Sequence, residues 1–159
     1  MRLTRGARLT LTHTHRPAQR GPGGLRAASA GLPVLRLWGP LARDVLASAT
    51  QGDVSNEAFP FMACGAAVAA GVAGRLFRIS FSGEQAYEVA VPARYGAALF
   101  ARLVELARGL GGGPYGLEAL NVLRIEKGLL THAELHGRTT LDDLGLARML
   151  AKGKDCIGK

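Results

Sequence analysis

The segment at residues 77–93 restricts the possible folds most, because its apolar and polar residues alternate on both sides of a turn. Its sequence, FRISFSGEQAYEVAVPA, predicts two antiparallel strands that meet at residues 82–84. Side chains on a strand point alternately to its two faces. The second strand therefore presents Tyr87, Val89 and Val91 on one face, and Ala86, Glu88 and Ala90 on the other.

Glu88 is the only acid on this second strand and stands between two alanines. A carboxylate in such a recess directs two oxygens outward in one plane. That arrangement suits a flat ligand with two adjacent N–H donors, such as a guanidinium or a pterin ring. A solvated glutamate on the outer face of an antiparallel sheet gives the same pattern. The alternation alone leaves both interpretations open.

The sequence before this segment predicts further strands. Residues 66–70 and 75–81 are apolar runs separated by residues 71–74, which is the pattern of a hairpin with a four-residue loop. A short strand is also predicted at Val34–Trp38. The hairpin and the strand of Glu88 together predict an antiparallel meander. We expect one core face to be formed by Phe77, Ile79 and Phe81.

Three segments have the periodicity of amphipathic helices. The clearest is opened by Pro92, repeats Tyr and Leu at spacings of three and four, and ends at Gly109. The other two helices are predicted at residues 40–49 and at Leu117–Lys127. Because hairpins adjoin these helices, the predicted fold class is α+β, with an antiparallel or mixed sheet and packed helices.

The net charge of +8 is concentrated at the start of the chain. Residues 1–43 contain eight arginines and no acid, whereas the remaining residues contain twelve basic and twelve acidic side chains. Residues 1–37 contain no Phe, Tyr or Trp on which bases would stack, so a nucleic-acid partner is not predicted. We expect residues 1–33 to be a disordered or unrelated basic leader.

Hydropathy and cysteine content predict a cytoplasmic protein without a membrane span. The most apolar run, residues 62–74, is interrupted by glycines and is shorter than the roughly 20 residues that a spanning helix needs. Cys64 and Cys156 form no paired motif, which predicts two reduced thiols.

Other polar clusters carry no strong chemical signal. His132, Glu134 and His136 alternate, and two imidazoles on one strand face suit zinc or iron, but no third ligand is evident, so no metal site is predicted. Thr140 and Asp143 have capping-box spacing and predict the start of a short helix. No nucleophile elbow or phosphate loop is present, and no catalytic residue is predicted.

Four longer strings carry a family resemblance. The strings are DVSNEAFPFM at residues 53–62, RLFRISFSGEQAYEVAVPA at 75–93, YGLEALNVLRIEKG at 115–128 and GRTTLDDLGLARM at 137–149. They resemble the alpha chain of heterotetrameric sarcosine oxidase, in its folate-binding region, which is similar to glycine-cleavage T-protein aminomethyltransferases. The resemblance covers about residues 34–159 in order and without large gaps.

In that family, the one-carbon unit of oxidised sarcosine passes to tetrahydrofolate. The resemblance therefore implies tetrahydrofolate as the ligand, with FAD, FMN and NAD bound only in the rest of the assembly and with other subunits as partners. It implies that Glu88 contacts the pterin, and that Tyr87 and Phe81 shape its neighbourhood. Leu120 stands where T-proteins have an arginine, so one folate contact is missing.

The resemblance also predicts the domain limits. Residues 34–154 form a partial folate-binding domain, and residues 155–159 begin a C-terminal β domain. Residues 1–33 do not resemble the family, so we expect a fragment that is not competent for amine oxidation alone. The missing opening strands would leave apolar faces uncovered, which predicts low stability or self-association.

Several alternatives remain. A true T-protein would be expected to keep the arginine that Leu120 replaces. A related iron–sulfur repair protein would show K-G-C-Y-x-G-Q-E, which does not follow Lys127 and Gly128. Two further alternatives are a non-catalytic folate-binding remnant and a basic RNA-binding tail on an inert domain.

Overall fold

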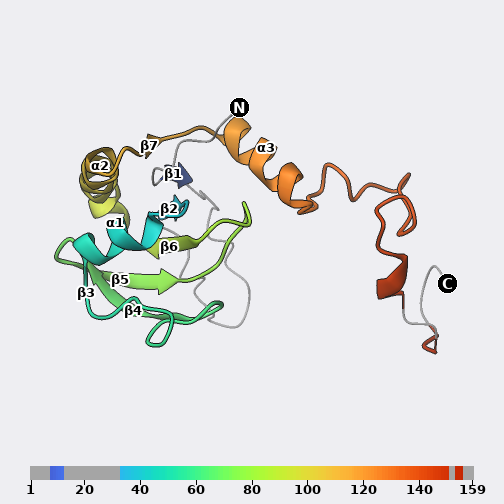
Figure 1. The fold of residues 1–159 in the computed structure, drawn as a ribbon, viewed down its shortest axis with the longest axis horizontal. Helices are drawn as coiled ribbons and strands as arrows, with labels where there is room; N and C mark the ends of the chain where they lie inside the picture. Colours follow the sequence, from blue (N-terminus) through green and yellow to red (C-terminus); the bar gives the residue numbers. More distant parts are fainter. Residues whose placement is uncertain (1–7, 13–32, 151–152, 156–159) are drawn as a thin grey trace, which may run out of the picture.

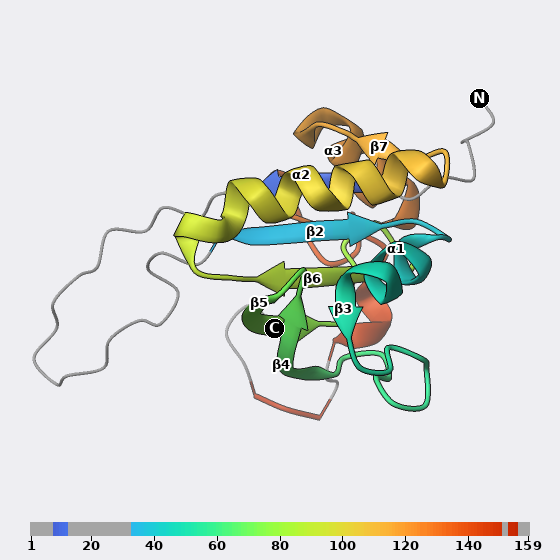
Figure 2. The ribbon, with the colours of Figure 1, turned by 90° about the vertical axis from the view of Figure 1, so that its left-hand side faces the viewer.

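The computed structural model describes residues 8–12, 33–150 and 153–155, and confirms the predicted α+β class. Within this part of the chain, a single mixed sheet is covered on one face by two helices (Figures 1 and 2). In chain order the elements are β1 (Arg8–Thr12), β2 (Val34–Trp38), α1 (Ala42–Ala49), β3 (Thr50–Gln51), β4 (Cys64–Ala69), β5 (Val72–Phe77), β6 (Ala86–Ala90), α2 (Ala93–Gly109), β7 (Gly113–Pro114), α3 (Leu117–Lys127) and the 3-10 helix η1 (Ala147–Met149).

The strand order in the sheet is β3-β4-β5-β6-β2-β1-β7. All neighbouring strands are antiparallel except β1 and β7, which are parallel. The predicted meander is confirmed by β4, β5 and β6. Strand β6 lies between β5 and β2, and its Glu88 is directly opposite Arg36 of β2 and Phe77 of β5.

The hairpin of β4 and β5 is tighter than predicted. Its turn consists of Ala70 and Gly71 alone, both with positive φ, which matches the type I′ turn that follows the twist of paired strands. The predicted loop at residues 71–74 is therefore wrong. Gly74 lies inside β5. A Cβ at this position would be 2.3 Å from the carbonyl oxygen of Ala90, so the strand requires a glycine here. In the sequence, a glycine that permits such a close backbone approach looks the same as a glycine that marks a loop.

The core lies between the sheet and helices α1 and α2. Alternation on β6 is confirmed, because Tyr87, Val89 and Val91 are buried in this core and Glu88 lies on the other face. The residues that the sheet and the two helices contribute include Leu35, Leu37, Leu76, Tyr87, Val89, Val91, Val45, Leu46, Leu99 and Leu103.

The predicted core face of Phe77, Ile79 and Phe81 is wrong. Strand β5 buries Leu76, which is only 2% exposed, so its neighbour Phe77 points to the opposite face. Ile79 and Phe81 follow the end of the strand, and Phe81 is 37% exposed. The alternation of the three apolar residues continues past the point where strand pairing stops.

The helices lie close to their predicted positions. Helix α1 begins at Ala42 rather than at residue 40, and α2 follows Pro92 and ends at Gly109 as predicted. Of the tyrosine and leucines that repeat along α2, Leu99 and Leu103 are buried in the core, but Tyr95 is exposed. Its place toward the sheet is taken by Gly96, which packs closely against Pro33.

Helix α3 spans Leu117–Lys127 as predicted and contacts the face of the sheet opposite α1 and α2. Its Leu120 packs with Trp38 and Ala86, and the rings of Trp38 and Tyr115 lie 5.4 Å apart. After α3 the chain extends away from the sheet (Figure 1). There Thr140 and Asp143 form the predicted reciprocal cap, although only a turn and η1 follow it.

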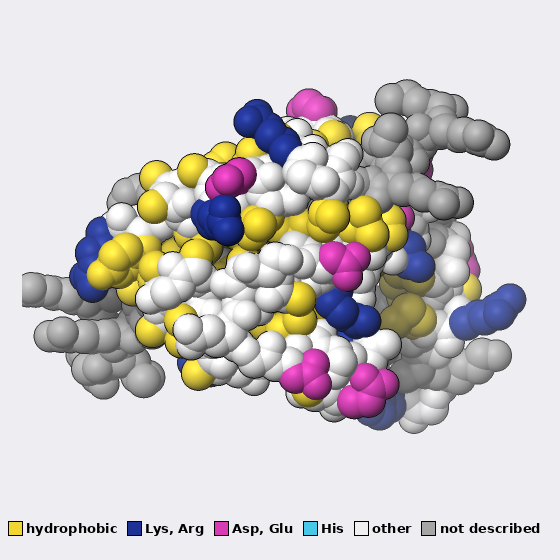
Figure 3. All heavy atoms as spheres, turned by 60° about the vertical axis from the view of Figure 1, so that its left-hand side comes forward, with side chains coloured by type: hydrophobic (Ala, Val, Ile, Leu, Met, Phe, Trp, Pro, Cys, Tyr) yellow, Lys and Arg dark blue, Asp and Glu magenta, His cyan; other side chains and the backbone are white. Residues whose placement is uncertain are grey.

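Strand β1 lies within the predicted leader and pairs with β2. The rest of that leader, residues 1–7 and 13–32, is outside the described residues, as are residues 156–159 of the predicted C-terminal β domain. Cys64 is a free, exposed thiol. Among the described residues, no helix has both the length and the apolar character needed to cross a bilayer. On the face in Figure 3, basic and acidic side chains are interspersed.

Candidate functional site

Strand β6 places Glu88 on the face of the sheet opposite α1 and α2, which is called the open face below. Its side chain is 15% exposed, and the flanking Ala86 and Ala90 are buried. Tyr87 lies on the opposite face, where its hydroxyl accepts a hydrogen bond of 3.0 Å from Arg43 Nε. Tyr87 therefore fixes the strand rather than lining the space around Glu88.

An arginine from the neighbouring strand meets the carboxylate of Glu88. Arg36 Nε donates a hydrogen bond to Glu88 Oε1 in an ion pair whose arginine side chain is 27% exposed. The planar hydrogen-bond donor that contacts Glu88 in this structure is thus the guanidinium of Arg36, which belongs to the same sheet. Within the described residues, Glu88 Oε2 accepts no hydrogen bond.

Sequence reasoning missed Arg36, although a signal for it existed. Alternation along β2 puts Leu35 and Leu37 in the core and so places Arg36 on the open face. What the sequence does not show is the register, which pairs two residues 52 positions apart.

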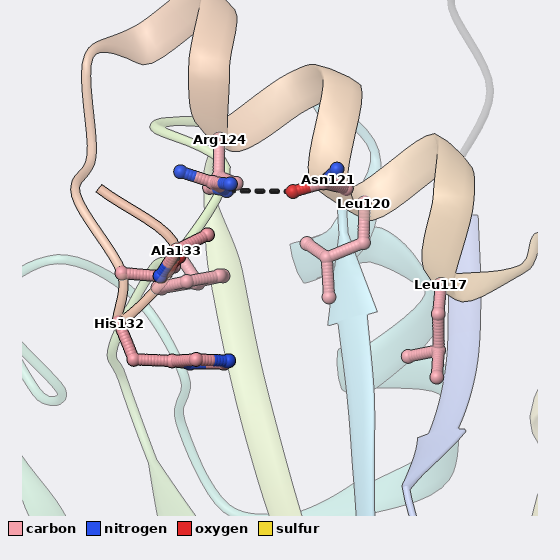
Figure 4. Close-up of a pocket in the computed structure, with 8 residues that line it drawn as sticks. Leu117, Leu120, Asn121, Arg124, His132 and Ala133 are labelled. Carbon is pink, nitrogen blue, oxygen red and sulfur yellow. Dashed lines mark hydrogen bonds between the residues drawn. The ribbon is translucent and has the colours of Figure 1, made fainter. Parts of the chain in front are cut away.

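A pocket of about 250 Å³ lies beneath α3, between this helix and the segment that follows it (Figure 4). Leu120 connects the pocket with the open face of the sheet, because it lines the pocket and packs against Ala86. Ala86 and Glu88 are successive residues on that face, but Glu88 does not line the pocket. The lining residues are Phe81, Leu117, Leu120, Asn121, Arg124, Thr131, His132 and Ala133.

Arg124 organises the polar side of the pocket. It is buried and donates to Asn121 Oδ1 at 2.8 Å, to the Leu129 carbonyl at 3.1 Å and to Glu134 Oε2 at 2.6 Å. The Arg124 guanidinium and the Thr131 N–H together lower the pKa of Glu134 from its ordinary 4.5 to about 2. The hydrogen bonds of Arg124 therefore hold the turn that follows α3.

The histidines considered for metal binding do not lie on a strand. Residues 131–136 form a turn in which Glu134 is engaged by Arg124, and His136 Nδ1 accepts a hydrogen bond of 3.3 Å from the Arg138 N–H. Across the described part of the chain, no group of three His, Cys, Asp or Glu side chains is placed to hold a metal ion.

Residues 7–154 match the family model described as the GCVT N-terminal domain. The match includes β1 to α3, and hence both Arg36 and Glu88. The chain belongs to the GCVT N-terminal domain family.

Two relatives illustrate the proteins to which this chain is similar. The sarcosine oxidase alpha subunit of Rhizobium meliloti (strain 1021) is 49% identical over 128 residues, which are 79% of this chain and 13% of that subunit. The aminomethyltransferase of Symbiobacterium thermophilum is 34% identical over 139 residues, which are 82% of this chain and 36% of the relative. The predicted resemblance is confirmed, and the chain spans only a small part of these relatives.

Among solved structures, the chain is similar to the heterotetrameric sarcosine oxidase from Corynebacterium sp. U-96 in complex with pyrrole 2-carboxylate. That match has a TM-score of 0.49 and 23% identity, and it covers 58% of this chain and 45% of the other.

Proposed function

We propose that this GCVT N-terminal domain is a folate-binding segment of a sarcosine oxidase alpha chain. In the full assembly it would help to transfer the one-carbon unit of oxidised sarcosine to tetrahydrofolate. The family match and the 49% identity with a sarcosine oxidase alpha subunit support this proposal. The observation that carries it is the carboxylate of Glu88, which is partly buried between two alanines on the open face of the sheet.

The chemistry around Glu88 fits a reduced pterin ring. The ring offers adjacent N–H donors, and an ionised carboxylate is an acceptor with about four lone-pair sites. Among the described residues, Arg36 donates to Oε1 alone, which leaves Oε2 and part of Oε1 as acceptors. Beside this group, Leu120, Ala86 and Trp38 are buried against one another and make the surroundings of the carboxylate apolar.

The rest of the reaction belongs to the proposed assembly. FAD, FMN and NAD would bind outside this segment, and other sarcosine oxidase subunits would be its partners. We assign no catalytic residue to the segment and place the assembly in the cytoplasm. The folate-binding domain is proposed to include residues 34–154 together with β1, which pairs with β2, and a C-terminal β domain is proposed to begin at residue 155.

Titration with 5-formyltetrahydrofolate tests the proposal, with the emission of Trp38, the single tryptophan, as the signal. Glu88→Gln keeps the side-chain shape and removes the charge. We expect it to weaken binding by about tenfold or more, because hydrogen bonds to charged groups contribute about 1.5–3 kcal/mol. The matched control is Glu84→Gln, at an exposed position of the preceding turn. Equal affinities of the Glu88→Gln variant and the unmutated chain would contradict the site.

A second candidate is a glycine-cleavage T-protein-type aminomethyltransferase, or a non-catalytic remnant of one. The 34% identity with an aminomethyltransferase favours it. Leu120 weighs against the T-protein, because this buried side chain packs on Trp38 and Ala86 where the T-protein pattern has an arginine. Release of ammonia from an aminomethylated donor protein in the presence of tetrahydrofolate would support the second candidate.

A further inference from the structure

We propose that Arg36 is a positioning residue that orients the Glu88 carboxylate for its ligand and remains bound to it in the complex. This inference rests on the proposed function, because it concerns the same ligand at the same carboxylate. It assigns a specific role to a side chain that the alternation of β6 does not reveal.

The first support is the fixed relation between the two strands. Arg36 and Glu88 are directly opposite in the β2–β6 register, and the neighbouring pairs Leu35–Val89 and Leu37–Tyr87 are buried in the core. A shift of register would turn these core residues toward the open face. The backbone therefore keeps Arg36 and Glu88 opposite each other whether or not a ligand is present.

The second support is the way in which the arginine engages the acid. The bond runs from Nε to Oε1, so the guanidinium takes one lone pair of one oxygen. A carboxylate has about four such sites, and a ligand with two adjacent N–H donors needs one on each oxygen. Three donors are therefore compatible with one carboxylate, and the ligand does not have to displace Arg36.

The third support is the restricted position of the pair. Both side chains are mostly buried, and Glu88 lies between two buried alanines that offer it no other polar contact. Without Arg36 the carboxylate would rotate among several rotamers on this face. A ligand would then have to order the side chain on binding, at a cost in affinity.

The opposite possibility makes an opposite prediction. A guanidinium and a pterin both present paired N–H donors, so Arg36 would be a competitor if the ligand needed the lone pair that Arg36 occupies. Removal of the arginine would then strengthen folate binding. The sign of the change in affinity separates a positioning residue from a competing one.

A double-mutant cycle on the 159-residue chain tests the inference. The variants are Arg36→Met, Glu88→Gln and the double variant, each titrated with 5-formyltetrahydrofolate. We expect Arg36→Met to weaken binding by about tenfold, and to have no further effect in the Glu88→Gln background. Arg36→Lys should bind with intermediate affinity, because it keeps the charge but loses the Nε donor.

The matched control is Arg75→Met, on the exposed part of β5, where Arg75 contacts Cys64 rather than Glu88. It should leave the affinity unchanged. Urea unfolding reports whether each variant is folded, and Arg36→Gln, which keeps an N–H donor, replaces Arg36→Met in the cycle if the latter is unfolded.

Tighter or unchanged binding by Arg36→Met would overturn the inference. So would an equal loss of affinity in the Glu88→Gln background, because the arginine would then act through the stability of the sheet. Failure of the unmutated chain to bind the folate would instead refute the proposed function, and the inference with it.

Discussion

Arg124 and Glu134 show how one ion pair fixes the turn that closes the pocket beneath α3. The arginine is buried, and it accounts for the largest part of the decrease in the pKa of Glu134 to about 2. A carboxyl whose pKa is lower in the folded chain stabilises that state above its unfolded pKa of about 4.5. This contribution is lost as the pH falls from 4.5 toward 2.

The first prediction follows from this sign. At pH 7 we expect Glu134→Gln to unfold at a lower urea concentration than the unmutated chain, because the variant lacks the charged partner of Arg124. The difference between the two midpoints should shrink as the pH decreases below 4.5, since the unmutated chain then loses the same interaction. A difference that stays constant from pH 7 to pH 3 would show that the charge of Glu134 is not involved.

At the scale of single residues, the sequence predicts faces better than partners. The alternation of β6 correctly separates Glu88 from Tyr87, because the period of two is a local property of the backbone. The partner Arg36 depends on a register between distant segments, which no local pattern contains. The sequence also does not show the engagement of Glu134 by Arg124, because it depends on how the turn after α3 folds back against the helix.

At the scale of elements, helix limits were predicted accurately and strand limits less so. Helix α3 was located by its leucine periodicity and by the glycine that follows it. Strand β5 lies earlier in the sequence than predicted, because Gly74 is typical of a turn and the apolar alternation continues beyond Phe77. Strand limits depend on pairing with β4 and β6, and the apolar pattern of β5 alone does not show where that pairing begins and ends.

Gly74 provides the prediction at this scale. Gly74→Ala would place a Cβ 2.3 Å from the Ala90 carbonyl oxygen and 3.0 Å from Val91 Cγ1, so β5 and β6 would have to move apart. We expect a loss of about 1–3 kcal/mol in the free energy of unfolding, as for other overpacked sites. The matched control is Gly109→Ala, where no atom lies within 4 Å of the added carbon. If urea unfolding gives equal stabilities for the two variants, the close approach of the strands is not rigid.

At the scale of the whole molecule, the uncovered apolar side chains are the main physical liability. The side chain of Phe77, in the predicted core face, is half-buried, and other apolar side chains are more exposed than it is. Within the described residues, α3 presents apolar side chains away from the sheet as well as toward it, since Leu120 and Leu123 are buried whereas Val122 and Ile125 are exposed. A helix that is apolar on several sides is usually covered by other protein.

The last prediction therefore concerns association. Ile125 is 56% exposed in the last turn of α3, and we expect the chain to associate as its concentration rises. Ile125→Ser should increase the monomer fraction in sedimentation velocity, because it removes apolar area worth about 25 cal/mol per Å² from any contact on this helix. Glu126→Ser, at the exposed neighbouring position, is the control for a general change of the surface. An unmutated chain that sediments as a monomer at every concentration and melts in one sharp, reversible transition would show that α3 needs no further cover.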